Sequence, residues 1–318
     1  MFFSVFPFIP LPVSFRKMQS IQWSPWRALD GFAPLTPRVF AEILDGGQSF
    51  RWHSLPDAQR VFQGIWSDNI AQLSLDEKGA LRWRAPRAIA RRVGAALPRY
   101  LAAATDFELL TGTLPWRKDA RLASAIDAFR GLRILRQPLG EALLGFICSA
   151  TKQIPQIKQM LALLAERHGA EISPALRGFR RLPTWGELGA LSEEQLRACK
   201  LGFRARHIFG AARFLAEHPA GWLDETEALP YPAAKERLML LPGVGEKVAD
   251  CALLFGAGRY EAFPVDTWIR RVLLENSRGA RTPADARAHY GRAAGLANAY
   301  LFAHARESAR AARPARKT

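Results

Sequence analysis

The 318-residue chain contains few cysteines and no long apolar segment, and each scarcity excludes several classes of protein. Its three cysteines, Cys148, Cys199 and Cys251, are odd in number and show no CxxC spacing. A disulfide framework, a zinc finger or an iron–sulfur cluster is therefore not expected. No stretch reaches the roughly 18 uninterrupted apolar residues that a membrane-spanning helix needs. The sequence predicts a soluble protein without a metal site or a cofactor.

Acidic residues are also in the minority. The chain has 45 Lys+Arg against 29 Asp+Glu, which gives a formal net charge of +16. A chain with this charge is attracted to polyanions, of which nucleic acid is the commonest. Hydrophobic residues make up 49% of the chain, enough for a large core. At roughly 100–200 residues per domain, the length suggests about two domains.

The two ends of the chain differ from its body. Residues 1–17 are aromatic and apolar, but they lack a basic start and are interrupted by prolines, which argues against a signal peptide. We expect this segment to lie outside the fold, or to be untranslated with Met18 as the true start. Residues 306–318 carry basic side chains among alanines, which predicts a helix end that frays into a basic tail.

The pattern of apolar residues changes near residue 90. In 18–90, short alternating segments separated by polar turns predict an antiparallel sheet, with one helix at 37–44. In 91–305, apolar residues recur at three- and four-residue intervals between proline and glycine stops, which predicts helices. The expected fold class is α+β, an N-terminal antiparallel β-sheet domain followed by a mostly helical region. The expected helices in that region are 122–129, 140–150, 154–168, 192–199, 204–217, 233–241, 247–255 and 267–276.

A glycine-containing hairpin followed by a lysine carries most of the functional information. The sequence LPGVGEK at 241–247 lies between two predicted helices. Gly243 and Gly245 can adopt positive φ and leave their amides free, so the turn, with Val244 at its centre, can present several N–H groups to one phosphate oxygen. The alternative is an ordinary helix–turn–helix connection without a ligand. We interpret the hairpin as a sequence-independent grip on the DNA backbone.

Lys247 and Asp266 are the candidate catalytic residues. Lys247 lies in the first turn of a predicted helix, where the helix dipole disfavours a positive charge, and only a neutral amine is nucleophilic. Local sequence alone favours the other interpretation, a surface lysine that contacts phosphate. Asp266, in the sequence PVD, is expected to cap the next helix. Its carboxylate can also stabilise the positive charge that develops on a sugar as its base departs.

Five segments of the sequence carry a family resemblance: GGQSFRW at 46–52, FICS at 146–149, LGFRAR at 201–206, LPGVGEKVADC at 241–251 and PVD at 264–266. In this order they resemble the 8-oxoguanine DNA glycosylases of the helix-hairpin-helix superfamily, over about residues 20–308. The resemblance implies a bifunctional DNA glycosylase and apurinic-site lyase of base excision repair. Lys247 would attack the sugar of a flipped 8-oxoguanine nucleotide, expel the base through a Schiff base, and cleave the strand by β-elimination, with Asp266 as the second catalytic residue.

The resemblance also implies a pocket for the excised base. The carbonyl of Gly47 would accept a hydrogen bond from N7–H of 8-oxoguanine and repel the N7 acceptor of guanine. Phe302 would stack on one face of the base and Cys251 would lie on the other. Asn298 takes the place of a glutamine that contacts the Watson–Crick edge. From the residues alone, Phe302 and Cys251 are more simply explained as ordinary core residues.

Several DNA-contacting positions depart from the family pattern. Thr151 replaces the asparagine that fills the vacated stack, Phe203 replaces a wedging tyrosine, and Trp268 replaces a phosphate-binding histidine. Gln156 stands where the family has an arginine that contacts the orphaned cytosine, although Arg204 keeps a second cytosine-contacting position. These departures predict excision with a weaker preference for cytosine opposite the lesion than is usual in the family.

Two other functions remain open. A monofunctional alkylated-purine DNA glycosylase of the same superfamily would rely on the aspartate alone, and Lys247 argues against it. A non-catalytic DNA-binding protein would use the hairpin only to hold the backbone. The expected partner is double-stranded DNA containing oxidised guanine, bound by a monomer without membrane association. The expected location is the cytoplasm or nucleoid of a bacterium, or the nucleus of a eukaryote.

Overall fold

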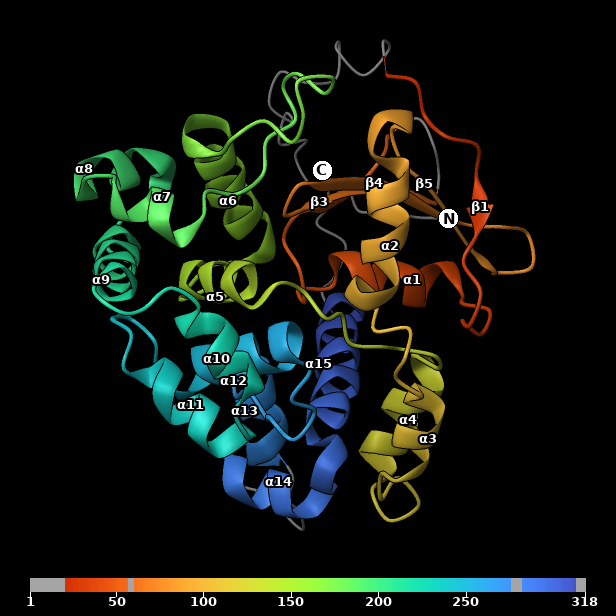
Figure 1. Cartoon of the computed structure of the whole chain (residues 1–318). Helices are drawn as coiled ribbons and strands as arrows, with labels where there is room; N and C mark the ends of the chain where they lie inside the picture. The colour runs from red at the N-terminus through yellow and green to blue at the C-terminus, as the bar shows by residue number, and fades with distance from the viewer. Residues whose placement is uncertain (1–20, 57–59, 276–281, 313–318) are drawn as a thin grey trace, which may run out of the picture.

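The structure is a computed structural model that describes residues 21–56, 60–275 and 282–312 (Figure 1). The predicted segment 1–17 lies outside these residues, as does the end of the predicted tail. An antiparallel sheet near the N-terminus is followed by helices, so the predicted α+β class is confirmed. Within the described ranges, no helix is both long enough and apolar enough to span a bilayer.

The N-terminal sheet has five antiparallel strands. Its pairing places Trp52 opposite Gly64. A Cβ atom at Gly64 would lie 2.2 Å from the Trp52 ring, so only glycine fits at this position. The strand order is β1 (Arg27–Ala28), β5 (Leu81–Arg84), β4 (Asn69–Leu75), β3 (Val61–Trp66) and β2 (Trp52–Ser54).

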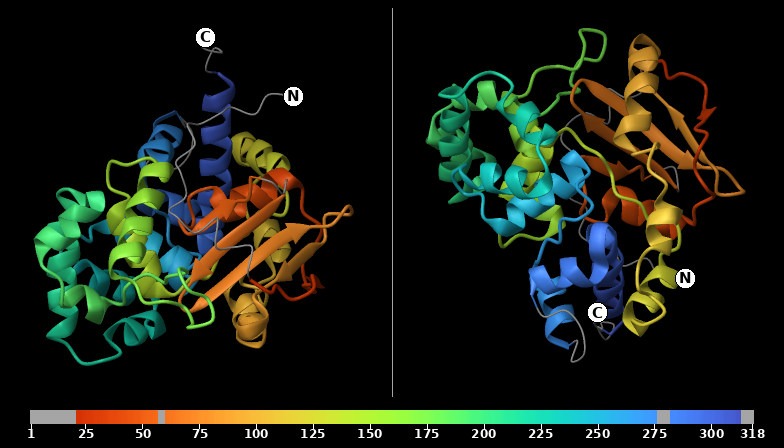
Figure 2. Two further views of the ribbon diagram at one scale, coloured as in Figure 1. Left: turned by 90° about the horizontal axis from the view of Figure 1, so that it is seen from above. Right: turned by 60° about the horizontal axis from the view of Figure 1, so that its bottom comes forward.

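A buried aromatic cluster joins the sheet to α2 (Ala90–Tyr100), which lies across it (Figures 1 and 2). Trp52 is fully buried and stacks on Trp66 at 5.9 Å between ring centroids. The indole N–H of Trp52 donates to the hydroxyl of Tyr100 at 2.9 Å, and that hydroxyl donates to Oγ of Ser49 at 3.2 Å. This cluster anchors the segment that follows α1 (Pro37–Asp45) and leads into β2.

The helical part surrounds a central helix, α5, which packs against α6, α9 and α12. The sheet and the α7–α9 group lie on opposite sides of the molecule (Figure 2). Each of the eight helices predicted after residue 90 overlaps an observed helix. The helices are α3 (Phe107–Gly112), α4 (Ala120–Ala128), α5 (Leu139–Cys148), α6 (Ile154–His168), α7 (Trp185–Gly189), α8 (Glu193–Leu196), α9 (Arg204–Ala216), α10 (Trp222–Ala228), α11 (Tyr231–Met239), α12 (Glu246–Ala252), α13 (Thr267–Glu275), α14 (Pro283–Tyr290) and α15 (Ala294–Ala311).

The helix end predicted after Arg306 is longer than the boundary at residue 306 implies. Helix α15 continues to Ala311 and buries Arg306, so the first residues of the predicted basic tail are helical. The physical reason is an ion pair between Arg306 and Glu42 of α1, which compensates the buried charge.

Glu141 of α5 ties the sheet to the helical part and makes stability depend on pH. Its carboxylate accepts a hydrogen bond from the backbone N–H of Ser67 at 2.6 Å. Burial raises the pKa of Glu141 from 4.5 to about 7, opposed by the Ser67 N–H and the charge of Arg51. The folded protein therefore binds more protons than the unfolded chain between these two values, and the contribution of Glu141 to stability falls as pH rises through this window.

We expect the variant Glu141→Gln to lose this pH dependence, because an amide oxygen still accepts from Ser67 but does not ionise. Between pH 5 and pH 8, the free energy of unfolding of the variant should rise relative to the parent by at most about 3 kcal/mol. Because Glu141 is partly exposed to water, the change in unfolding free energy should be smaller than this limit. Urea unfolding at the two pH values measures it. An equal difference between variant and parent at both pH values would contradict the assignment.

Candidate active site and DNA-binding hairpin

The predicted hairpin joins α11 to α12. Gly243 has φ of 80°, and the N–H of Val244 donates to the carbonyl of Leu241 at 3.0 Å to close the turn. Gly243 and Gly245 are exposed, whereas Val244 is buried. A Cβ at Gly243 would lie 2.4 Å from His207, which also requires glycine. The hairpin thus presents exposed backbone at the N-terminus of α12, the arrangement that favours phosphate binding.

A buried carboxylate fixes the two helices of the hairpin relative to each other. Asp250 of α12 accepts a hydrogen bond from the Tyr231 hydroxyl at 2.7 Å and pairs with Lys235 at 3.1 Å, both from α11. Burial raises the pKa of Asp250, and these two partners oppose the rise. The position of the first turn of α12, which precedes Asp250 and carries Lys247, therefore depends on this contact.

Lys247 is half-buried in the first turn of α12. Its Nζ donates to Oγ of Ser149 at 2.8 Å and lies 5.3 Å from the ring centroid of Phe146. The Ser149 hydroxyl donates in turn to the carbonyl of Phe146 at 2.7 Å. The amine is thus held at the end of α5 by a neutral hydroxyl and an aromatic ring.

Asp266 caps α13, as its sequence context predicts. Its Oδ1 accepts a hydrogen bond from the N–H of Ile269 at 2.8 Å. Burial raises the pKa of Asp266, and the Ile269 amide and the charge of Lys247 oppose the rise. The carboxylate therefore lies within the electrostatic reach of the Lys247 amine.

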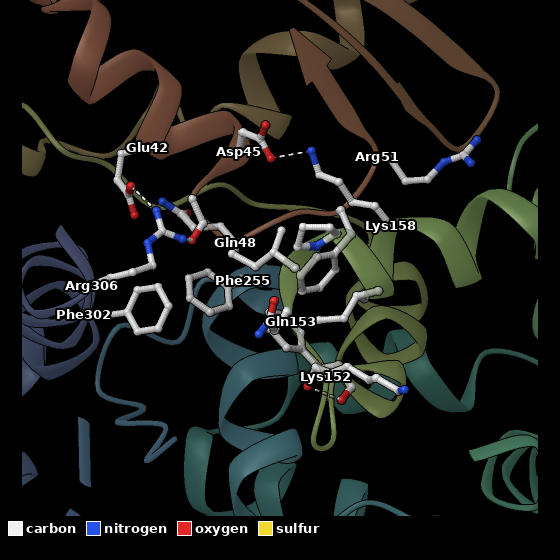
Figure 3. Close-up of a pocket in the computed structure, with 18 of the residues that line it drawn as sticks. Glu42, Asp45, Gln48, Arg51, Lys152, Gln153, Lys158, Phe255, Phe302 and Arg306 are labelled. Atoms are coloured by element: carbon white, nitrogen blue, oxygen red, sulfur yellow. Dashed lines mark hydrogen bonds and ion pairs between the residues drawn. The ribbon is translucent and has the colours of Figure 1, made fainter. Parts of the chain in front are cut away.

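Most of the predicted site residues line one cavity of about 2320 Å³. Figure 3 shows part of the lining of this cavity, with Phe302 among the labelled side chains. Its wall combines the turn after α1, the ends of α5 and α6, α12, the start of α13, and α15. The hairpin glycines with Val244, and also Phe203 and Arg204, are not part of this wall. The predicted residues that line the cavity are Gly47, Thr151, Lys247, Cys251, Asp266, Trp268, Asn298 and Phe302.

Two of the predicted base-contacting residues, Gly47 and Phe302, lie close together, and Cys251 lines the same cavity. Gly47 has φ of 112°, and a Cβ there would lie 3.0 Å from Ile154 and 3.9 Å from the ring of Phe302. Cys251 is buried, and burial raises the pKa of its thiol to about 12, so it is neutral and behaves as a small apolar group. Gly47, Phe302 and Cys251 thus provide a mainly apolar surface suited to a planar ring.

Asn298 has a structural contact in addition to its place in the cavity wall. It is buried, and its Nδ2 donates to the carbonyl of Pro264 at 2.8 Å. Since Pro264 begins the PVD segment, this bond supports the loop that carries Asp266. Contact between Asn298 and a base stays a prediction.

The residues predicted to lie near the base opposite the lesion differ in exposure and in their contacts. Phe203 is exposed, whereas Arg204 is buried and donates to Oγ1 of Thr151 at 2.9 Å and to the carbonyl of Ala150. Thr151 has φ of 55°. The side-chain oxygen of Gln156 accepts from the backbone N–H of Gln153 at 3.1 Å and so caps α6. One guanidinium nitrogen of Arg204 is thus engaged by Ala150 and Thr151, and its contact with a DNA base stays a prediction.

Sequence reasoning missed the polar contacts that hold the GGQSFRW segment in place. Gln48 donates to the carbonyl of Arg133 and accepts from the N–H of Leu135, both at 2.9 Å. Gln137 donates to the carbonyl of Gln48 at 2.7 Å. These partners are more than 80 residues from Gln48 in the chain, so no local pattern indicates them.

Comparison with known proteins gives consistent matches. Residues 35–143 match the family described as 8-oxoguanine DNA glycosylase, N-terminal domain. An N-glycosylase/DNA lyase of Arabidopsis thaliana is 34% identical over 203 residues, 58% of this chain and 55% of that protein. The match therefore spans only about half of that relative's length. A protein of Methanothermobacter thermautotrophicus named "Probable N-glycosylase/DNA lyase" is 32% identical over 216 residues, 60% of this chain and 69% of that protein.

A solved structure extends the similarity to nearly the whole fold. It is the crystal structure of Clostridium acetobutylicum 8-oxoguanine glycosylase/lyase in complex with double-stranded DNA containing cytosine opposite 8-oxoguanine. The TM-score is 0.76 at 26% identity, covering 91% of this chain and 98% of that one. With the five motifs in order, a cavity lined by residues of four of them and these relatives in sequence and structure, the chain belongs to the 8-oxoguanine DNA glycosylase family.

Proposed function

We propose that this protein is a bifunctional DNA glycosylase and apurinic-site lyase of base excision repair that removes 8-oxoguanine from double-stranded DNA. One observation carries the proposal. The amine of Lys247 enters the same cavity as Asp266, Gly47 and Phe302, directly beside the exposed hairpin. Family membership and the net charge of +16 support a DNA substrate.

DNA binding combines a backbone grip with displacement of a base. The amides of the hairpin hold a phosphate near the entrance of the cavity. The exposed ring of Phe203 is available to stack on bases of the duplex. A flipped nucleotide enters the cavity, where Phe302 stacks on its base, and unstacking costs a few kcal/mol.

The chemistry starts from the neutral amine of Lys247. Nζ bonds to C1′ of the flipped nucleotide, the bond from C1′ to the base breaks, and its electron pair leaves with the base, which gains a proton. Loss of protons from Nζ and opening of the sugar give a Schiff base between Nζ and C1′. Removal of a C2′ proton then expels the 3′ phosphate by β-elimination. Asp266 stabilises the positive charge that develops on the sugar.

Gly47 distinguishes 8-oxoguanine from guanine. Its carbonyl accepts a hydrogen bond from N7–H of 8-oxoguanine. In guanine N7 carries no hydrogen and is itself an acceptor, so it repels the carbonyl. A site that pairs with a donor discriminates strongly against an analogue without it, because a buried acceptor is otherwise left unpaired.

A protein with this activity acts where DNA is, in the cytoplasm or nucleoid of a bacterium or in the nucleus of a eukaryote, and we propose that it acts as a monomer.

Excision opposite each of the four bases tests the proposal and its predicted specificity. We expect the duplex with 8-oxoguanine to be cleaved with less than about a 10-fold preference for cytosine, because a lost bidentate base contact is worth about 1–3 kcal/mol. The reason is that Gln156 caps α6 and Arg204 is tied to Ala150 and Thr151. Single-turnover rates give the preference. Excision of methylated purines but not of 8-oxoguanine would favour the alkylated-purine glycosylase instead.

A pair of variants at residue 156 sharpens this test. Gln156→Arg adds a planar guanidinium and should increase the preference for cytosine about 10-fold, whereas Gln156→Lys adds the same charge without bidentate geometry and should not. A strong cytosine preference in the parent protein, unchanged in both variants, would contradict the specificity hypothesis while leaving the proposed activity intact.

A further inference from the structure

Arg306 is a buried cation between two elements of the proposed base pocket. It lies one turn after Phe302 in α15, and only 8% of its surface is exposed. Its guanidinium pairs with the carboxylate of Glu42 and donates to the carbonyl of Gly46. Its Cζ also lies 5.3 Å from the ring centroid of Phe302, and Figure 3 shows the three side chains together. One side chain thus contacts the turn that contains Gly47 and the ring expected to stack on the base.

The turn at Gly46 and Gly47 needs such support. Two successive glycines have wide freedom in φ and ψ, so the direction of a carbonyl between them is poorly fixed by the chain itself. Arg306 holds the carbonyl of Gly46, and Gln137 holds the carbonyl of Gln48 at 2.7 Å. The carbonyl of Gly47 lies between these two restrained peptide groups.

The opposite side of the turn has a second contact of the same kind. Lys158 of α6 forms an ion pair with Asp45 and donates to the carbonyl of Trp52 at 2.6 Å (Figure 3). Lys158 thus contacts both ends of the segment 45–52, which contains Gly46 and Gly47. Arg306 differs from the Lys158–Asp45 pair because Arg306 contacts both the Gly46–Gly47 peptide and the ring of Phe302.

The charge of Arg306 is balanced locally. Burial raises the pKa of Glu42, and the Arg306 guanidinium opposes that rise. An arginine presents several donors in one rigid plane, so it can contact a carboxylate, a carbonyl and an aromatic face together. A lysine has a single ammonium and cannot reproduce this geometry.

We infer that Arg306 is a positioning residue that sets recognition of the lesion, through the Gly46 carbonyl and the Phe302 ring. The inference rests on the proposed function. It predicts a separation of two activities: excision of 8-oxoguanine needs the base pocket, whereas cleavage at an abasic site, which has no base, needs only Lys247 and the DNA grip. A misplacement of about 1 Å at such a site costs roughly 100-fold in rate.

The test compares these two activities in Arg306→Met. We expect excision of 8-oxoguanine to fall about 30- to 100-fold, with cleavage of a preformed abasic site within about threefold of the parent. The double variant Glu42→Gln/Arg306→Met removes both charges, so that no lone buried carboxylate destabilises the fold, and should show the same separation. Arg306→Lys should recover little of the lost excision.

Arg181→Met is the matched control. Arg181 is also mostly buried and donates to a carbonyl, that of Leu182, and to the carboxylate of Glu187, but it does not line the cavity. This variant should keep both activities. Equal losses of excision and abasic-site cleavage in Arg306→Met and in the double variant, or full excision in these two variants, would overturn the inference. A parent protein with neither activity would instead refute the proposed function.

Discussion

Lys247→Gln is expected to abolish both base excision and strand cleavage. Removal of a covalent nucleophile lowers the rate by roughly 1000-fold or more, because no other group forms the bond to C1′. Glutamine is one bond shorter than lysine, but it is uncharged and keeps an N–H donor on the side of Oγ of Ser149, which now bonds to Lys247 at 2.8 Å. The variant should therefore fold and bind lesion-containing DNA with nearly unchanged affinity.

Borohydride trapping provides the measurement. Reduction of the Schiff base should attach the parent protein covalently to a duplex that contains 8-oxoguanine, and Lys247→Gln should give no such adduct. Lys78→Gln makes the same chemical change on an exposed turn of the sheet and serves as the control that still traps. A trapped adduct with Lys247→Gln would identify another amine as the nucleophile. Tight binding by a parent protein that neither excises nor traps would favour the non-catalytic DNA-binding alternative.

Much of the fold could be predicted because its signals are local. Alternation in β3 and β4 and the three- and four-residue periodicity of α6 and α9 specify these elements directly. The helix α2 was not predicted, because it contains Gly94 and Pro98, which ordinarily end helices. Burial of Val93 and Leu97 against the core outweighs those local preferences.

The site was predictable only where its residues form motifs. The hairpin and the Asp266 cap follow from adjacent residues, whereas the approach of Gly47 to Phe302 follows from the resemblance and then from the structure. No pattern indicated that Arg204 turns toward Ala150. Likewise, Arg306 begins the predicted basic tail, and no local pattern indicates its partner Glu42, which lies 264 residues away in the chain. Contacts of this kind depend on tertiary packing, which a sequence pattern does not encode.

Asp266→Asn is expected to separate the two roles of this residue. Asparagine caps helices about as well as aspartate, so its side-chain oxygen should keep the bond to the N–H of Ile269, now 2.8 Å, and stability should change by less than about 1 kcal/mol. The charge that stabilises the developing cation is lost, and removal of one such electrostatic group costs roughly 100- to 1000-fold in rate. Asp266→Ala should lose the same activity and, in addition, about 1 kcal/mol of stability from the missing cap.

The pH dependence of excision distinguishes a catalytic carboxylate from a structural one. Burial raises the pKa of Asp266, so its ionised form is lost at a higher pH than for an ordinary aspartate. Activity of the parent protein should rise with pH as this carboxyl ionises, and single-turnover rates should lose that acid limb in Asp266→Asn. An unchanged acid limb in the variant, or a rate close to that of the parent, would mean that Asp266 only caps α13. A lost limb with unchanged stability would place its charge at the reacting sugar, opposite the amine of Lys247.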